Sequence, residues 1–176
     1  MNDMATSKLG TSPEAATVRL ERLLPGPIER VWAYLTESDK RATWFASGVF
    51  DLRVGGKADL HFDHDKISSE KRPADRPKGE CDFAGSITRV EPPRLLVFTF
   101  GATTPASEVT FELEPRGKEV MLVITHRRLP NRNTMLQVAG GWDAHVGILA
   151  DRLNGIEPRP FWTTHAKLKS QYEATL

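Results

Sequence analysis

The stretch HFDHD, residues 61–65, brings together residue types that bind zinc. Side chains on a strand point alternately to its two faces. His61 and Asp63 therefore share the face opposite Phe62, whereas His64 points the other way. Because these side chains do not converge, and no other ligands occur at a recognised spacing, we expect a solvated strand end, no metal site and no cofactor.

Two further histidines are candidates for a functional site. In VMLVITH, His126 continues the alternation of Leu122 and Ile124, so it should point inward. There it either orients a ligand or transfers protons, since the ordinary pKa of histidine is near neutral, or it is a buried histidine bonded to backbone. His145 lies about 60° from Trp142 on a predicted helix and is either a second polar group at a cavity edge or a flank residue.

The only cysteine, Cys81, shares the inward parity of Phe83 and Ile87, which predicts a small buried side chain and no reactive thiolate. A single cysteine excludes an internal disulfide and fits a reducing compartment, so we expect the cytoplasm. The sequence contains no G-x-S-x-G elbow, P-loop or G-x-G-x-x-G fingerprint. Nucleophilic and cofactor-dependent enzymes are therefore not supported.

The 176 residues suit a single domain, and the charges are balanced, with 24 Lys and Arg against 23 Asp and Glu. These charges are interspersed, which does not favour a nucleic-acid partner. No apolar run approaches the roughly 18 residues of a membrane span, and the first residues lack the apolar core of a signal peptide. We expect a soluble protein with no membrane partner.

Periodicity predicts the elements that position these residues. A period of two indicates strands, and spacings of three or four indicate helices. Gly55-Gly56 suits the turn of a hairpin, and the charged stretch 65–78 suits an exposed loop. The predicted strands are 17–24, 50–54, 58–62, 80–90, 94–100, 107–115 and 118–128, and the helices are 28–35, a short one carrying Trp44 and Phe45, and a long one at 134–154.

Strands and helices are thus segregated along the chain, which predicts an α+β fold with an antiparallel sheet. We expect a strongly curved sheet of about seven strands around the long C-terminal helix, with two short helices after the first strand. The expected organisation is a flexible N-terminus at 1–16, one domain at 17–155 and a C-terminal extension with a short helix at 156–176.

The segments FDLRVGGKADLHF, GSITRVEPPRLLVFTF, THRRLP and GGWDAHVGILADRL carry a family resemblance. In order and spacing they resemble the bacterial activator of heat shock protein 90 ATPase homologue-like proteins, members of the START/SRPBCC helix-grip superfamily. The resemblance covers residues 17–155 and implies a helix-grip fold; the family name also suggests a stress response. In this superfamily the region after the first helix and the long helix flank a cavity entrance, but the fold does not name a ligand.

A helix wrapped by a curved sheet leaves a space in which ligands usually bind. Inward-facing aromatic residues and the two histidines are the side chains that we expect to line it. These candidates are Trp44 and Phe45 at the mouth, Phe62, Phe98 and Phe111 on the strands, Trp142 on the long helix, and His126 and His145.

Three functions fit such a fold. The leading hypothesis is a binding module for a small hydrophobic or amphipathic molecule. The alternatives are a cyclase- or dehydratase-like enzyme that uses the same cavity and a co-chaperone-like interaction module. A cavity of several hundred Å³ would favour the first two, whereas a filled interior would favour the third.

Three glycines in the long helix need an explanation, because each costs about 1 kcal/mol relative to alanine. Gly140, Ala144 and Gly147 lie opposite the inward face, while Gly141 lies on its flank and could either let the helix approach a strand or leave room beside Trp142. Either the small residues are merely exposed, or the tail packs over them as a helix through Phe161, Trp162, Leu168, Tyr172 and Leu176. That packing would occur within the same domain or across a homodimer.

Overall fold

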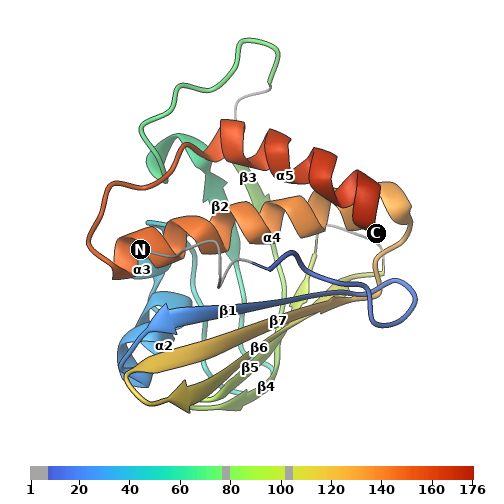
Figure 1. The fold of residues 1–176 in the computed structure, drawn as a ribbon. Helices are drawn as coiled ribbons and strands as arrows, with labels where there is room; N and C mark the ends of the chain where they lie inside the picture. Colours follow the sequence, from blue (N-terminus) through green and yellow to red (C-terminus); the bar gives the residue numbers. More distant parts are fainter. Residues whose placement is uncertain (1–7, 77–79, 102–104) are drawn as a thin grey trace.

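The computed structural model describes residues 8–76, 80–101 and 105–176. Figure 1 shows an antiparallel sheet with α4 lying over one face and α5 packed on the outer side of α4. The elements, in chain order, are β1 (Val18–Pro25), α2 (Ile28–Thr36), α3 (Ser38–Arg41), β2 (Leu60–Asp63), η1 (His64–Lys66), β3 (Glu80–Phe83), β4 (Ile87–Glu91), β5 (Leu95–Phe100), β6 (Ser107–Arg116), β7 (Glu119–Arg127), α4 (Arg132–Leu153) and α5 (Phe161–Thr175).

The main sheet has five strands in the order β1-β7-β6-β5-β4, all paired antiparallel. Alternate residues of its strands are buried in the core, as the period of two predicted: Val120, Leu122 and Ile124 are all about 1% exposed. The α+β class, the antiparallel sheet and the long C-terminal helix are therefore confirmed. No helix within the described ranges combines the length and the apolar character needed to cross a membrane.

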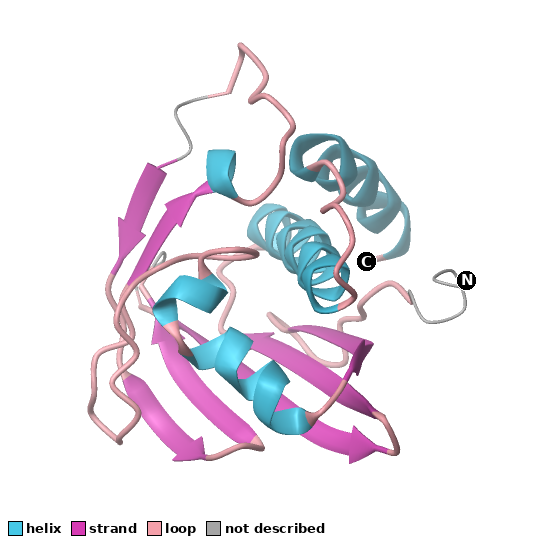
Figure 2. Ribbon diagram, turned by 90° about the vertical axis from the view of Figure 1, so that its left-hand side faces the viewer, coloured by secondary structure: helices cyan, strands magenta, loops and turns pink. Residues whose placement is uncertain are grey.

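The strands form a five-stranded and a two-stranded sheet, whereas we expected one sheet of about seven strands. The segment predicted as a single strand at 80–90 breaks at Gly85, where an added Cβ would overlap the carbonyl oxygen of Thr99. Because the backbone passes so close to β5, only glycine fits and the strand bends. Its first half pairs with β2 and its second half with β5, and in Figure 2 the pair β2-β3 stands beside the larger sheet.

The predicted strand at 50–54 is wrong. Phe50 makes an isolated bridge with Ala58 and packs its ring 5.1 Å from that of Phe98, but Leu52 and Val54 are 39% and 69% exposed. The alternating apolar residues therefore do not form one buried face. The turn that was expected at Gly55-Gly56 is wider, since the N–H of Asp51 donates to Lys57 O over 2.9 Å, and Gly55 has a φ of +85°.

The second short helix, α3, ends at Arg41 and does not carry Trp44 and Phe45. The guanidinium of Arg41 is fully buried and donates to the carbonyl oxygens of Leu35, Thr36, Ala46 and Gly48. Burial lowers the pKa of Arg41 to about 10. This buried cation organises the turn that places Trp44 and Phe45 under α4.

The tail forms α5, which packs along α4 of the same chain (Figure 1). An added Cβ at Gly140 would lie 3.6 Å from the backbone nitrogen of Lys169, and one at Gly147 would lie 2.9 Å from Nη1 of Arg159. The small-residue face therefore lets the tail approach α4 closely, and Ala144 between the glycines is fully buried. Burial of this face needs no second copy of the chain.

Two segments that were expected to be free are held by the body of the protein. Within the segment 1–16, Gly10 is buried and donates from its N–H to Tyr172 Oη over 2.7 Å; residues 1–7 lie outside the described part. In the charged stretch 65–78, Ile67 is fully buried and Ser68 Oγ accepts from the N–H of Phe161 over 3.1 Å. The start of this loop thus docks against α5.

Candidate ligand-binding pocket

A small pocket lies between the N-terminal half of α4 and the strands. Its volume is about 130 Å³. This is well below the several hundred Å³ that we expected for a binding module or an enzyme. It still matches the roughly 150 Å³ at which an apolar cavity accommodates benzene. Its wall is formed by Phe45, Phe62, Phe100, His126, Val138, Gly141, Trp142 and His145.

Five of the predicted residues line this pocket: Phe45, Phe62, His126, Trp142 and His145. The other three, Trp44, Phe98 and Phe111, are fully buried core residues that do not reach it.

The prediction missed Phe100, Val138 and Gly141. The alternation in RLLVFTF places Phe100 on the same face as Phe98, and Val138 lies on the inward face of the helix with Trp142. Periodicity thus contained both signals, but it did not show how far along the sheet the pocket lies.

Aromatic contacts hold the pocket walls. The ring of Phe45 lies 4.7 Å from that of Trp142 in a stacked arrangement and 4.8 Å from that of Phe62 in an edge-to-face arrangement. Both geometries are favourable for aromatic pairs. The wall is therefore a packed set of rings, and not a group of loosely held side chains.

Gly141 accounts for part of the empty space. An added Cβ at this position would meet no atom within 4 Å, in contrast to Gly140 and Gly147. Gly141 directly precedes Trp142 and lies one helical turn before His145, so the lack of a side chain at Gly141 leaves room between these two residues of the pocket wall. This is the second of the two roles that the sequence suggested for Gly141.

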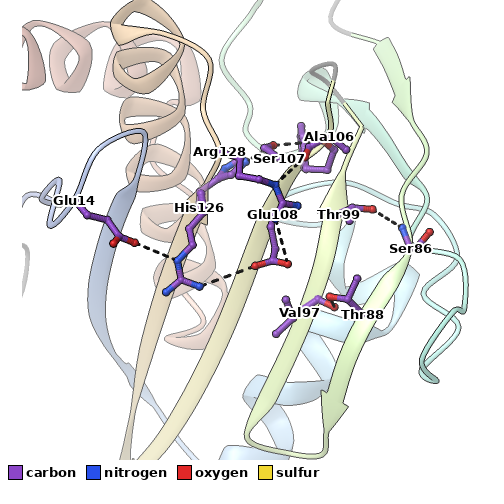
Figure 3. A network of polar contacts seen from close by, with 12 residues as sticks. Glu14, Ser86, Thr88, Val97, Thr99, Ala106, Ser107, Glu108, His126 and Arg128 are labelled. Atoms are coloured by element: carbon purple, nitrogen blue, oxygen red, sulfur yellow. Dashed lines mark hydrogen bonds and ion pairs between the residues drawn. The ribbon is translucent and has the colours of Figure 1, made fainter.

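Both ring nitrogens of His126 are engaged. Nε1 of Trp142 donates to Nδ1 of His126 over 3.0 Å, and Nε2 lies 2.7 Å from Oγ of Ser107. Figure 3 shows His126 and Ser107 on their neighbouring strands, close to the ion pair of Arg128 with Glu108. Because an indole N–H can only donate, Nδ1 is the acceptor and Nε2 carries the proton. Burial lowers the pKa of His126 to about 3, so the ring is neutral at physiological pH.

His145 is held differently. Its Nδ1 lies 2.8 Å from the carbonyl oxygen of Trp44, which can only accept, so Nδ1 carries the proton. The pKa of His145 is lowered to about 3, chiefly by burial and next by the neighbouring His64. The remaining nitrogen, Nε2, is consequently an acceptor in a neutral ring.

The family model described as "Activator of Hsp90 ATPase homolog 1-like protein" matches residues 25–154, which is most of the chain. The chain belongs to this family. The resemblance inferred from the motifs is thereby confirmed. No curated protein matches the sequence.

Solved structures agree with this family membership. The Bordetella parapertussis protein encoded by gene BPP1335 is 44% identical, with a TM-score of 0.82 over 97% of this chain and 92% of that chain. CalU16 from Micromonospora echinospora is 22% identical, with a TM-score of 0.69 over 95% and 94% of the two chains. DynU16, from the dynemicin biosynthetic locus, is 23% identical, with a TM-score of 0.65 over 82% of this chain and 49% of that chain. The latter two show the shared fold.

In this member of the Hsp90 ATPase activator-like family, Ser107 and His126 do not form an activated nucleophile. A base would need an unprotonated Nε2 facing the hydroxyl. That tautomer would place a proton on Nδ1, against the indole N–H of Trp142. The pair is instead a donor chain that ends at the carbonyl of Phe100, 3.4 Å from Ser107 Oγ. His126 is thus a buried, hydrogen-bonded histidine, which was one of its predicted roles, but its partners are side chains and not the predicted backbone groups.

The remaining chemical candidates lie outside the pocket. His61 pairs with Asp82 across β2 and β3, and the described residues contain no group of three or more side chains arranged to hold a metal. Cys81 is exposed, so the prediction of a buried thiol is wrong. It faces Phe62 across the two strands of the small sheet β2-β3.

A larger hollow of about 680 Å³ lies between the N-terminal segment and α5, but its character is different. Its arginines are already paired, Arg22 with Asp143 over 2.8 Å and Arg159 with Asp151 over 2.8 Å. Thr163, Lys167 and Gln171 add further polar groups to its wall. Such a surface suits water better than an apolar ligand.

Proposed function

We propose that this protein binds a small, neutral and largely apolar molecule in the pocket between α4 and the strands. The observation that carries the proposal is the composition of the wall: five apolar side chains, a glycine and two neutral histidines, with no Lys, Arg, Asp or Glu. A neutral apolar body fits such a wall, whereas a buried charge would lack a partner there.

The pocket volume of about 130 Å³ sets the scale of the bound group at one six-membered ring. A longer ligand would place one ring here and would require side chains of the wall to move. The cyclase-like alternative would need groups that exchange protons near neutral pH, and the neutral, buried His126 and His145 do not favour it.

Toluene is a suitable probe because it is apolar and consists of one substituted ring. We expect saturable shifts of the Trp142 indole signal when toluene is titrated into the protein and followed by NMR. The variant Gly141→Leu, whose side chain fills the empty space, should lose these shifts while it remains folded. Absence of binding to the wild type, or equal binding to the folded variant, would contradict the proposal.

Native mass spectrometry on protein purified gently from its host complements this test. A non-covalent adduct of a few hundred daltons, present in the native spectrum and absent after denaturation, would support the proposal and give the mass of the natural ligand. The Gly141→Leu variant should lack the adduct.

A further inference from the structure

We propose that His145 determines which ligands the pocket accepts: its Nε2 accepts a hydrogen bond from the ligand, so the preferred ligand is a neutral ring that carries a hydroxyl or N–H donor. This inference rests on the proposed function and adds the chemical class of the ligand. It distinguishes hydroxylated rings from hydrocarbons of the same size and from anions.

The orientation of His145 is fixed from two sides. Nδ1 is bound to the carbonyl of Trp44 at 2.8 Å. The ring packs edge-to-face on Phe45, with 5.1 Å between centroids, and lies 4.9 Å from the ring of Phe161. A ring held in this way cannot turn to exchange its two nitrogens without losing the bond to Trp44. Nε2 therefore remains the acceptor.

Within the described part of the chain, this acceptor is not used. No described residue donates a hydrogen bond to Nε2 of His145, although the residue is only 5% exposed and lines the pocket. A ligand that donates to this open acceptor forms a hydrogen bond within a largely apolar wall, which raises its affinity.

His126 provides the internal comparison. It lines the same pocket, but Trp142 and Ser107 occupy both of its nitrogens. The two histidines are thus alike in burial and in neutral charge, and they differ in having a free nitrogen. The capacity for a directional contact with a ligand lies at His145 alone among the lining side chains described.

The charge of the pocket excludes other polar ligands. A carboxylate or phosphate would find neither a cation nor a free donor in the wall, because its three protonated ring nitrogens are already bound: Nε2 of His126 to Ser107, Nδ1 of His145 to Trp44 and Nε1 of Trp142 to His126. An ammonium group would find no carboxylate. A neutral hydroxyl group needs one acceptor, and His145 supplies it.

Phenol and toluene form a matched pair of probes, because each is a benzene ring with one substituent of similar size. We expect the wild type to bind both, and His145→Phe to reduce the affinity for phenol relative to toluene by about tenfold, the effect of one buried hydrogen bond. His165→Gln is the control, since His165 contacts Phe161 but does not line the pocket, and it should leave the ratio unchanged.

The outcomes separate this inference from the proposed function. Binding of toluene without phenol to the wild type, or an unchanged ratio in His145→Phe, would overturn the role of His145 and leave the pocket intact. Binding of neither probe would overturn the proposed function and this inference with it.

A second measurement does not depend on the variant folding. In wild-type protein with ¹⁵N-labelled histidine, Nε2 of His145 should give the signal of an unprotonated nitrogen, and phenol but not toluene should shift it. A protonated Nε2, or equal shifts with the two probes, would overturn the inference.

Discussion

Oη of Tyr172 on α5 donates a 2.7 Å hydrogen bond to Oδ2 of Asp143 on α4. The other oxygen of this buried carboxylate accepts from Arg22 on β1 at 2.8 Å, and Tyr172 Oη itself accepts from the N–H of Gly10. One phenol group thus links the N-terminal segment, the sheet, the long helix and the tail. Burial, and next the charge of Asp143, raise the pKa of Tyr172, which keeps the donor protonated.

Replacing Tyr172 with Phe should lower the free energy of unfolding by about 1–3 kcal/mol, because Oδ2 of Asp143 and the N–H of Gly10 both lose their hydrogen bond to the phenol, while Arg22 still binds Oδ1 of Asp143. Urea denaturation measures the change. Tyr34, the other tyrosine, is the control, since its hydroxyl makes no hydrogen bond with a described residue and Tyr34→Phe should have a much smaller effect. Equal losses in the two variants would show that the network adds no stability.

Substitution by alanine should change the stability of the protein differently at two glycines of α4. Gly141→Ala should raise the free energy of unfolding by about 1 kcal/mol, because alanine favours the helix and its Cβ enters empty space. Gly147→Ala should gain less or lose stability, because its Cβ would lie 2.9 Å from Nη1 of Arg159. Two hydrogen bonds to Asp151 hold the Arg159 side chain in place. Thermal unfolding of both variants tests the contrast, and equal shifts in Tm would contradict it.

Gly141→Ala should also weaken toluene binding, since the methyl group takes up part of the pocket. A stabilising substitution that reduces binding would indicate that glycine is present at position 141 to keep space for a ligand. A variant with higher stability and unchanged affinity would instead separate Gly141 from the pocket.

Periodicity was sufficient to predict the fold and part of the site. The period of two in VMLVITH placed His126 inside, and the spacing of Leu168 and Tyr172 predicted the tail helix. These inferences hold because alternation and helical spacing are local properties of the chain, and because burial of one face then fixes how the elements pack.

What the sequence did not reveal depends on contacts between distant segments. The break at Gly85 arises from the approach of Thr99, and the exposure of Cys81 depends on which distant segments pack against β3. Similarly, parity put Phe98 and Phe100 on one face, but only the position of α4 decides that Phe98 belongs to the core and Phe100 to the pocket. Long-range geometry of this kind has no signature in a single sequence.

Cys81 should react with a thiol reagent in the folded protein. Its side chain is exposed on the edge strand β3, and partial burial together with the charge of Asp82 raises its thiol pKa, so labelling should accelerate as the pH rises above neutral. Ellman's reagent should modify one thiol per chain without denaturant, and Cys81→Ser should abolish the signal. Labelling that requires urea would contradict the exposed position.

Acid should destabilise the protein through His126 and His145. In the folded state the pKa of each is about 3, whereas an unfolded histidine has a pKa of about 6.5. As the pH falls from 6.5 towards 3, the unfolded chain therefore binds more protons than the folded protein. The stability contributed by the neutral rings is fully present above pH 6.5 and is lost across that window. For each histidine the expected loss between pH 7 and pH 5 is about 2 kcal/mol.

Urea denaturation at pH 7 and pH 5 isolates the part due to His126. In His126→Gln, an amide can still accept from Trp142 and donate to Ser107, but it cannot bind a proton in this range. The variant should therefore lose about 2 kcal/mol less than the wild type over the same interval. Equal losses in His126→Gln and the wild type would mean that His126 is protonated at pH 5 as readily in the folded protein as in the unfolded chain. The neutral hydrogen-bond chain from Trp142 through His126 to Ser107 would then be wrong.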